Sequence, residues 1–323
     1  MTKQKMQSPR NKTLKILDQE KDNLIKQIVL EKQLSCIDNL QNKIINCDYK
    51  KAIYKIKDES INLLILDPPY NLNKKFNSLK FSKTTIDKYT SYLQDILFAF
   101  LPKLKKDASV YICGDWYSSI SIYEAAAKIL QIRNRITWER EKGRAAKNNY
   151  KNCSEDIWFC TVGNKFTFNV EAVKLRRTVK APYKENGKPK DWTEFNSGKF
   201  RDTAPSNFMA DITIPFWSMK ENTKHPTQKS EKLIAKLILA SSNVDDVVCD
   251  PFLGSGTTAV VSKKLKRNFI AFEQEEEYCL WSQKRLNEAD KDIKIQGFSD
   301  NVFWERNTLL LQQKHKKTKS KLK

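Results

Sequence analysis

Histidine and paired cysteines are scarce in this chain of 323 residues. The two histidines, His225 and His315, lie far apart in the sequence, and none of the seven cysteines belongs to a C-x-x-C pair. Structural zinc sites are built from such pairs and clusters. The sequence therefore predicts no metal site, and scattered thiols are typical of proteins in a reducing cytoplasm.

Long apolar runs are missing as well. No stretch reaches the roughly 20 apolar residues that a helix needs to cross a bilayer. The first residues, Met-Thr-Lys-Gln-Lys, carry no apolar signal core. We therefore expect neither a membrane-spanning segment nor a secretion signal.

Acidic residues are outnumbered, with 38 Asp and Glu against 59 Lys and Arg, which gives a net charge of +21. A field of that sign attracts polyanions, and nucleic acid is the first candidate. A Lys-, Asn- and Ile-rich chain encoded by an AT-rich genome would show a similar excess, so charge alone does not identify the partner. The hydrophobic fraction of 40% exceeds that of disordered chains, so we expect a folded domain.

Short apolar runs alternate with amphipathic stretches from Lys43 onward, a pattern typical of an α/β sheet. The run Ile61–Leu66 is almost wholly apolar, which suits a buried parallel strand. Further strands are expected at 44–48, 109–113, 132–138, 157–162, 247–249 and 269–272, and helices at 89–104, 121–130, 230–240 and after Gly256.

Three segments fall outside this alternation. Residues 11–40 carry apolar residues at helical spacing, which predicts an amphipathic helix. Between Phe166 and Lys220 the periodicity fades while Pro, Gly, aromatic and basic residues accumulate, so we interpret this stretch as an inserted substrate-contacting region. Residues 314–323 contain six lysines and no acid, a composition that predicts a disordered basic tail.

The first chemical motif, Asp67-Pro68-Pro69-Tyr70, ends the most apolar expected strand, at the sheet edge where catalytic groups gather. An adenine amino nitrogen is a poor nucleophile because its lone pair is delocalised into the ring. The Asp67 carboxylate and the Pro68 carbonyl can accept its two N–H bonds, and Pro69 stiffens the turn. Tyr70 can stack on a base swung out of the duplex. A plain strand-ending turn is the competing interpretation.

The second motif runs from Asp250 to Thr257 and joins an expected strand to a helix. Its two glycines, Gly254 and Gly256, allow a cofactor to approach the backbone, but a dinucleotide fingerprint needs three. Glu273 ends the next strand about 20 residues further on, where an acid can accept hydrogen bonds from ribose hydroxyls. Together the two elements favour an adenosyl cofactor, with a generic tight turn as the competing interpretation.

In this order the motifs resemble the beta class of DNA amino-methyltransferases. In that family a D-P-P-Y tetrad precedes a variable target-recognition region, an H-P-T-Q-K segment and an F-x-G-x-G-T cofactor loop. This chain has all of them, with His225–Lys229 as the third and Phe252–Thr257 as the last. Ser230 stands where the family usually has proline, which weakens the rigidity of that turn alone.

The resemblance implies S-adenosylmethionine as the methyl donor and a role for each matching residue. Asp48 would receive the adenine amine of the cofactor, Glu273 would hold its ribose, and His225–Lys229 would lie near its methionine end. For His225, the start of a helix at Ser230 is an equally good explanation. The implied catalytic residues are Asp67, Pro68, Pro69 and Tyr70, and the implied cofactor residues are Asp48, His225, Lys229, Asp250, Phe252, Gly254, Ser255, Gly256, Thr257 and Glu273.

The resemblance also implies the fold: a Rossmann-like methyltransferase domain with a mostly parallel seven-stranded sheet, circularly permuted, and an antiparallel hairpin at one edge. The expected hairpin strands are Ile132–Trp138 and Ile157–Val162. The expected division is a helical extension at 1–42, a catalytic half at 43–164, a target-recognition region at 165–222, a cofactor-binding half at 223–298 and a basic tail at 299–323. Dimerisation is a further expectation, because members of this class often pair.

Basic residues in two places are candidates for contacts with duplex DNA, the expected substrate. Phosphate neutralisation is the task of such clusters, and the aromatic residues that alternate with the second group suit wedging into a duplex. A solvated basic loop is the competing interpretation. The candidates are Arg140, Arg144, Lys147, Arg176, Arg177, Lys180 and Arg201.

The sequence thus predicts a site-specific DNA methyltransferase acting on the N6 amine of adenine, as part of a restriction-modification system with a companion endonuclease. The nearest rival is a cytosine-N4 enzyme, in which serine more often stands at the position of Asp67. A methyltransferase of glutamine side chains or RNA would usually have asparagine there. A catalytically silent DNA-binding relative would not need Asp67, Gly254 and Glu273 intact.

Overall fold

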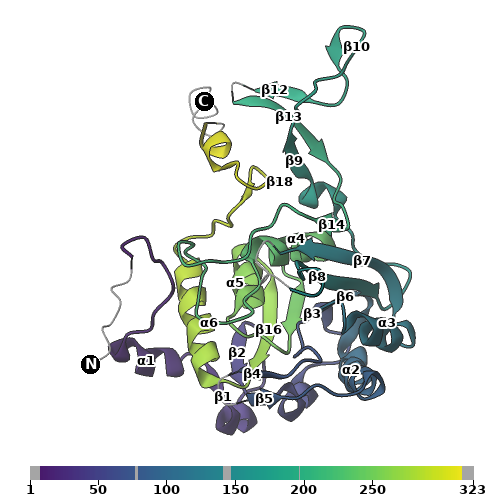
Figure 1. The fold of residues 1–323 in the computed structure, drawn as a ribbon. Helices are drawn as coiled ribbons and strands as arrows, with labels where there is room; N and C mark the ends of the chain where they lie inside the picture. Colours follow the sequence, from purple (N-terminus) through teal and green to yellow (C-terminus); the bar gives the residue numbers. More distant parts are fainter. Residues whose placement is uncertain (1–7, 77–78, 141–146, 196, 315–323) are drawn as a thin grey trace.

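The computed structural model describes residues 8–76, 79–140, 147–195 and 197–314. A nine-stranded sheet lies at its centre, with the strands in the order β1-β2-β16-β15-β3-β6-β8-β7-β14 (Figure 1). Only β8 among these nine runs antiparallel to its neighbours. The strands are β1 (Val29–Leu30), β2 (Lys43–Asn46), β16 (Asn268–Glu273), β15 (Val247–Asp250), β3 (Ile61–Leu66), β6 (Leu104–Gly114), β8 (Ser154–Thr161), β7 (Gln131–Glu139) and β14 (Phe208–Met209).

The mostly parallel sheet of the expected fold is confirmed. Seven strands from β2 to β7 form it, and β7 and β8 make the expected antiparallel pair near one edge. The structure adds a two-residue strand outside each end, β1 and β14, both parallel to their neighbours. These additions are too short to leave a pattern in the sequence.

Strand β3 shows why the apolar run lies at the centre of the sheet. Side chains alternate between the two faces of a strand, and here both faces are covered. Leu64 and Leu66 pack into one hydrophobic core, and Leu63 and Ile65 pack into another on the opposite face. A strand buried on both sides requires apolar residues at successive positions.

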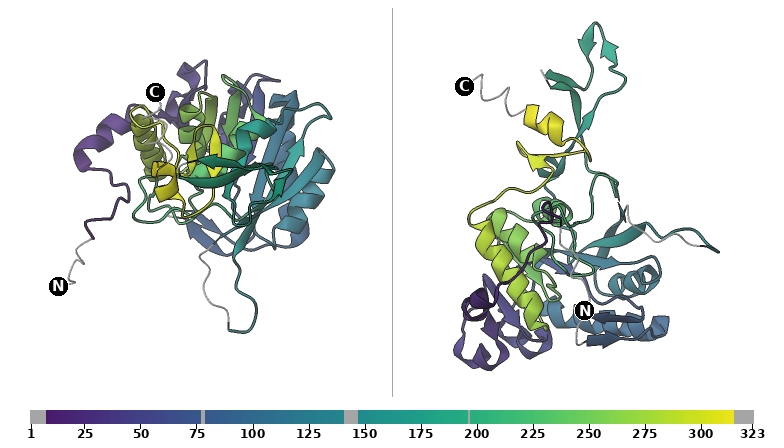
Figure 2. Two further views of the ribbon diagram at one scale, coloured as in Figure 1. Left: turned by 90° about the horizontal axis from the view of Figure 1, so that it is seen from above. Right: turned by 60° about the vertical axis from the view of Figure 1, so that its left-hand side comes forward.

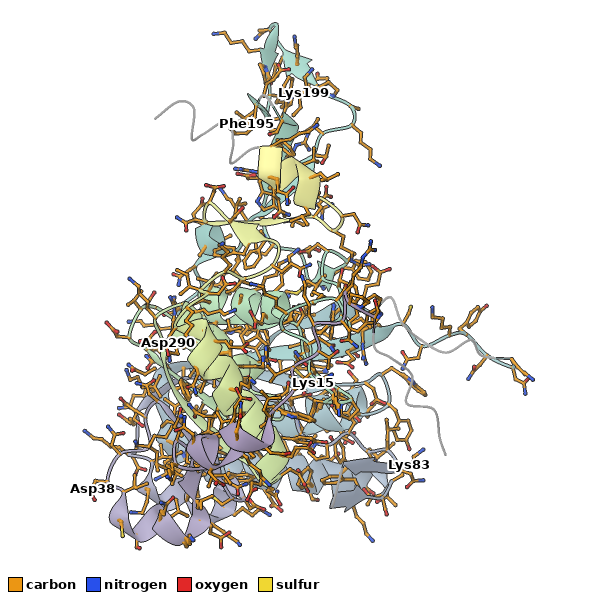
Figure 3. The ribbon with its side chains drawn as sticks, turned by 90° about the vertical axis from the view of Figure 1, so that its left-hand side faces the viewer. Lys15, Asp38, Lys83, Phe195, Lys199 and Asp290 are labelled. Carbon is orange, nitrogen blue, oxygen red and sulfur yellow. The ribbon has the colours of Figure 1, made fainter. Side chains whose placement is uncertain are left out.

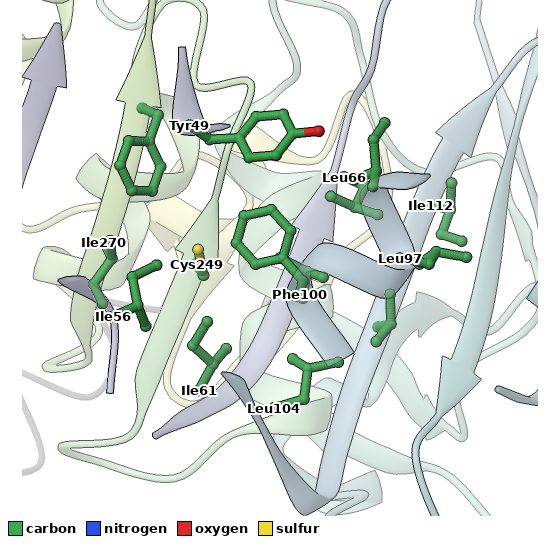
Figure 4. Close-up of a cluster of buried hydrophobic side chains, with 14 of the residues drawn as sticks. Tyr49, Ile56, Ile61, Leu66, Leu97, Phe100, Leu104, Ile112, Cys249 and Ile270 are labelled. Atoms are coloured by element: carbon green, nitrogen blue, oxygen red, sulfur yellow. The ribbon is translucent and has the colours of Figure 1, made fainter. Parts of the chain in front are cut away.

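Helices cover both faces of the sheet (Figures 1 and 2). Phe100 of α2 packs beside Cys249 and Leu66 in the core on one face (Figure 4). Helix α4 packs with β3 on the other face, where α5 and α6 also lie. The helices are α2 (Ile86–Phe100), α3 (Ser119–Ala127), α4 (Glu231–Ser241), α5 (Thr257–Lys264) and α6 (Glu276–Ala289), with short 3-10 turns at η2 (Tyr49–Lys51), η3 (Ile53–Lys55), η4 (Leu101–Lys103) and η5 (Val170–Val173).

The N-terminal segment differs from the single long helix that the sequence predicts. Helix α1 covers only Asp18–Ile25, and β1 and the 3-10 helix η1 (Glu31–Cys36) follow it. Most of its apolar residues are nevertheless buried, and Leu24 and Ile28 pack into a core with α6 and β16, although Leu17 is 52% exposed. The helical spacing therefore marked the buried face correctly but not the length of the helix.

A second, five-stranded sheet forms a lobe that projects from the main sheet (Figures 1 and 2). Phe195 and Lys199 lie on this lobe, away from Lys83 on the main domain (Figure 3). The order is β12 (Thr193–Phe195), β13 (Gly198–Thr203), β9 (Leu175–Thr178), β18 (Val302–Trp304) and β17 (Phe298–Ser299). Two separate hairpins are β10 (Lys184–Glu185) with β11 (Lys188–Pro189) and β4 (Lys74–Phe76) with β5 (Leu79–Phe81).

Strand β18 corrects the expected basic tail at 299–323, because its residues are built into the lobe. It pairs with β9 in parallel, and Phe303 and Trp304 are both fully buried. Trp304 packs with Phe200 inside the lobe, whereas Phe303 joins the core beneath α4. The strand therefore fastens the lobe to the main domain. Residues 315–323, which hold most of the lysines, lie outside the described part of the chain.

No helix in the described residues is long and apolar enough to cross a membrane.

Candidate functional site

Two distant stretches of sequence meet at one edge of the sheet. Strands β3 and β15 are parallel neighbours, and β16 lies beside β15. Their carboxyl ends therefore place Asp67, Asp250 and Glu273 at the same edge, where open α/β sheets bind ligands. All three carboxylates line one cavity of about 280 Å³.

The complete Asp67–Tyr70 tetrad lines this cavity. The Tyr70 hydroxyl donates to Asp67 Oδ1 at 3.1 Å, and burial raises the pKa of that hydroxyl, so it stays protonated. The Tyr89 hydroxyl of α2 donates to the Pro69 carbonyl at 2.9 Å. The Asn71 side chain accepts from the Thr84 backbone N–H and so closes the loop that follows the tetrad. The turn is thus held from both sides.

Lys229 lies against the tetrad. Its ammonium contacts Asp67 Oδ1 at 2.9 Å and Oδ2 at 2.7 Å, and Glu155 Oε2 at 3.3 Å, with 7% of the side chain exposed. Burial acts to lower the pKa of Lys229, but the Asp67 and Glu155 carboxylates outweigh it and hold the pKa above its ordinary value. The sequence predicted Lys229 as a cofactor residue, and the structure makes it the direct partner of Asp67.

The glycine loop lines the same cavity as the tetrad. Gly254 has a φ of +56°, and its backbone N–H donates to Glu273 Oε2 at 2.8 Å. A Cβ at Gly254 would lie 3.1 Å from His225 Nε2. The loop therefore lies directly on the His225 ring, and only a residue without a side chain fits there comfortably.

Gly256 has a different role from the expected one. It begins α5 with a φ of +87°, and a Cβ there would lie 2.7 Å from Ser282 Cα on α6. It is not among the residues that line the cavity. Gly256 therefore lets α5 and α6 pack closely, and its contact with the cofactor stays a prediction.

The other predicted cofactor residues line the cavity. Burial raises the pKa of Asp250 to about 7 and that of Glu273 to about 7, although backbone N–H groups donate to both carboxylates. Acids with such values in a cleft are typical of ligand sites. The predicted residues in the lining are Asp48, His225, Lys229, Asp250, Phe252, Gly254, Ser255, Thr257 and Glu273.

The site also contains residues that no sequence pattern indicated. Glu155 of β8 has 6% of its side chain exposed and contacts Lys229, Tyr70 and Arg140. Tyr89 supports the tetrad, and Tyr278 packs against the His225 ring. Glu155 belongs to no motif, and a single acid in a strand gives no signal of burial. The antiparallel pairing of β8 with β6, the neighbour of β3, is what brings it to the catalytic edge.

Three of the predicted DNA contacts are ion-paired within the protein. Arg140 pairs with Glu155, Arg201 pairs with Asp191 at 2.9 Å, and Arg176 binds Asp202 through two bonds of 2.7 and 2.6 Å. The Arg176 side chain is 12% exposed and lies over the Trp304 ring. Arg176 therefore stabilises the lobe, a role that composition alone could not distinguish from phosphate binding.

The remaining predicted DNA contacts are more accessible. Arg177 and Lys180 are exposed on the lobe, and Lys147 is exposed beside the loop after β7. Arg144 lies outside the described residues. The exposed residues keep their interpretation as candidate phosphate contacts.

Comparisons with known proteins identify the family. Residues 61–284 match a family of N6 and N4 methyltransferases described as DNA methylase. Type II methyltransferase M1.MboII of Moraxella bovis is 30% identical over 269 residues, which cover 77% of this chain and 98% of that protein. DNA adenine methyltransferase YhdJ of Escherichia coli K12 is 32% identical over 258 residues, covering 78% and 84% of the two chains.

Solved structures share the fold. A crystal structure of an M1.HpyAVI–SAM complex is 24% identical with a TM-score of 0.51, covering 75% of this chain and 98% of the other. The cytosine-N4-specific PvuII DNA methyltransferase is 17% identical with a TM-score of 0.57, covering 78% and 92%. The chain belongs to the DNA methylase family of S-adenosylmethionine-dependent N6 and N4 amino-methyltransferases.

Proposed function

We propose that this protein transfers a methyl group from S-adenosylmethionine to the N6 amine of adenine in duplex DNA. The observation that carries the proposal is that the Asp67 carboxylate and the Gly254 loop line the same cavity. A methyl donor on the loop side would lie beside an amine held on the carboxylate side. Holding the two reactants in line supplies a large part of the rate.

The residues on the loop side fit the donor. Glu273 ends β16 as an acid beside the Gly254 backbone, which suits ribose hydroxyls. Asp48 and Phe252 also line the cavity, and they offer a carboxylate for an amino group and an aromatic ring for an adenine face. S-adenosylmethionine supplies an electrophilic methyl on a positively charged sulfonium, and a cavity lined by several acids favours that charge.

The tetrad prepares the acceptor. Asp67 and the Pro68 carbonyl take the two N–H bonds of the target amine, which draws electron density back to the nitrogen. Tyr70 stacks on the extruded base. The amine nitrogen would form a bond to the methyl carbon as the carbon–sulfur bond of the donor breaks, and its surplus proton would leave to solvent. The residues Asp67, Pro68, Pro69 and Tyr70 are therefore the proposed catalytic set.

Adenine is the proposed base because an aspartate begins the tetrad, where the family's cytosine enzymes more often carry serine. One relative is named a DNA adenine methyltransferase. The test is mass spectrometry of nucleosides from duplex DNA incubated with the protein and S-adenosylmethionine. The proposal requires N6-methyldeoxyadenosine, whereas N4-methyldeoxycytidine would establish the cytosine alternative. If the protein binds the cofactor but forms neither product, it is a catalytically silent DNA-binding relative.

The division of the chain follows from the same proposal. Residues 43–164 and 223–298 supply the catalytic and cofactor halves, and residues 1–42 are an extension. The projecting lobe is the proposed target-recognition region, and it includes β17 and β18 as well as residues 165–222. The names of the type II relatives support a companion endonuclease. A homodimer is a further proposal, checked by light scattering in solution.

Exposed basic residues on the lobe are the proposed phosphate contacts. Replacing Arg177 and Lys180 together with glutamine should weaken DNA binding and lower the slope of log affinity against log salt by about 1 for each lost contact. A Lys128→Gln variant at the exposed end of α3 is the matched control. A salt slope that stays at the wild-type value in the double variant would remove both residues from the interface.

Cofactor binding should depend on the protonation of Glu273. Burial raises the pKa of this carboxyl to about 7, so the free protein holds a proton there below that pH. Ribose hydroxyls bind the ionised form best, so the protonation of Glu273 alone should lower affinity roughly tenfold from about pH 8 to about pH 6. Isothermal titration calorimetry measures this.

The Glu273→Gln variant is the control for that pH dependence. It should bind the cofactor weakly at every pH and lose about the tenfold contribution of Glu273, leaving only the dependence that comes from Asp250, whose pKa is also about 7. A full wild-type pH profile in the variant would show that Glu273 does not govern binding.

A further inference from the structure

Four charged side chains of alternating sign run from the centre of the cavity toward the loop after β7. Asp67 contacts Lys229, Lys229 contacts Glu155, and Glu155 contacts Arg140. Lys229 and Glu155 have only 7% and 6% of their side chains exposed, and Asp67 has 22%. Buried charges persist only when they are paired, so the positions of these groups depend on one another.

The Lys229 ammonium occupies the Asp67 carboxylate, which the target amine needs as a hydrogen-bond acceptor. Its ammonium contacts both Asp67 oxygens, at 2.9 and 2.7 Å, and lies 3.2 Å from the Tyr70 hydroxyl. In the free protein it therefore neutralises Asp67 in the place of the amine. Before the amine can donate to Asp67, the ammonium has to release at least one of these oxygens.

Glu155 offers the released ammonium a second carboxylate. Its Oε2 is 3.3 Å from Lys229 Nζ, so a displacement of roughly half an ångström would give a normal hydrogen bond. The Glu155 carboxylate is itself held in place. The Arg140 guanidinium pairs with its Oε1, and the Tyr70 hydroxyl lies 3.3 Å from its Oε2. The carboxylate is thus fixed while the ammonium is shared.

We propose that Glu155 is a positioning residue that takes over the Lys229 ammonium when Asp67 accepts the target amine. Glu155 does not touch the base, and it acts only through Lys229. The inference rests on the proposed function, since it assigns the amine to Asp67. Without Glu155 the ammonium has a single carboxylate partner and competes with the amine for Asp67.

A double-mutant cycle separates this role from a structural one. The variants are Glu155→Gln, Lys229→Met and the double variant, assayed by single-turnover methyl transfer with saturating cofactor and DNA carrying the mapped site. Glu155→Gln alone should slow transfer roughly 10- to 100-fold, the range expected for a group that acts through another residue. In the Lys229→Met background, the same change should alter the rate less than about threefold.

A second measurement applies the same double-mutant cycle to a step before methyl transfer, because Lys229→Met can be too slow to assay by turnover. Extrusion of the target base is followed by fluorescence of 2-aminopurine placed beside it, with sinefungin in place of the cofactor. Glu155→Gln should weaken extrusion in the wild-type background and leave it unchanged in Lys229→Met. Glu139→Gln is the matched control, because Glu139 pairs with Arg306 at the end of β7 with 40% of its side chain exposed.

The outcomes are distinguishable. If the Glu155→Gln defect is equally large in both backgrounds, Glu155 acts independently of Lys229 or only supports the fold, and the inference is overturned. Wild-type transfer and extrusion in Glu155→Gln would overturn it too. If the wild-type protein transfers no methyl group to DNA, the proposed function fails instead.

Discussion

Replacing Asp67 with asparagine is expected to slow methyl transfer roughly 1,000-fold, the size of effect seen when a group that acts on the reacting atoms is lost. Asparagine keeps the volume but loses the charge and one of the two acceptor oxygens. Its amide N–H₂ would face either the Lys229 ammonium or the target amine, and both are donors. Single-turnover transfer to DNA measures the loss.

Cofactor binding in Asp67→Asn should stay within about threefold of wild type, since Glu273 and the Gly254 backbone, the proposed ribose contacts, do not bond to Asp67. Lys229 keeps Glu155 as a partner, so the fold should survive the change. Asp58→Asn is the matched control, because Asp58 is exposed and pairs with Lys103. Near-wild-type transfer by Asp67→Asn would refute the catalytic assignment.

Replacing Trp304 with alanine is expected to disorder the lobe and abolish DNA binding while the cofactor site survives. Trp304 is fully buried against Phe200, and its indole N–H donates to Ser299 Oγ at 3.0 Å. Removing a buried tryptophan costs about 3–5 kcal/mol. The small hydrophobic cluster of the lobe should not survive such a loss. The cores of the main domain are separate from this cluster, so the main domain should stay folded.

Limited proteolysis, DNA binding and cofactor titration together check the Trp304 prediction. The variant should be cleaved within residues 175–203, fail to bind DNA, and bind the cofactor with wild-type affinity. Trp116→Ala is the matched control, because Trp116 is 64% exposed on the main domain. Unchanged DNA binding by Trp304→Ala would mean that the lobe does not recognise the substrate.

The sequence predicted the central sheet well because its strands are buried on both faces. A strand such as Ile61–Leu66 must be apolar throughout, and the expected range matches β3 residue for residue. The tetrad and the glycine loop could be placed together because both follow parallel strands. The carboxyl ends of neighbouring parallel strands necessarily share an edge of the sheet.

The sequence was a poorer guide where partners come from distant segments. Val302–Trp304 is too short to stand out as a strand, and only its pairing with β9 reveals that it completes the lobe. Arg176 and Arg177 are adjacent and identical in type, yet the Asp202 carboxylate holds one while the other faces solvent. Glu155 reaches Lys229 only because β8 pairs with β6, the neighbour of β3.

For the proposed methyl transfer, the cavity that Asp67 and the Gly254 loop line must hold both reactants. A crystal structure with sinefungin and duplex DNA carrying the methylated site tests this most directly. The account predicts the adenosyl ribose on Glu273, an extruded adenine whose amine lies within hydrogen-bond reach of Asp67, and the sinefungin amine pointing at it. An analogue bound elsewhere, or a target base that never approaches Asp67, would contradict it.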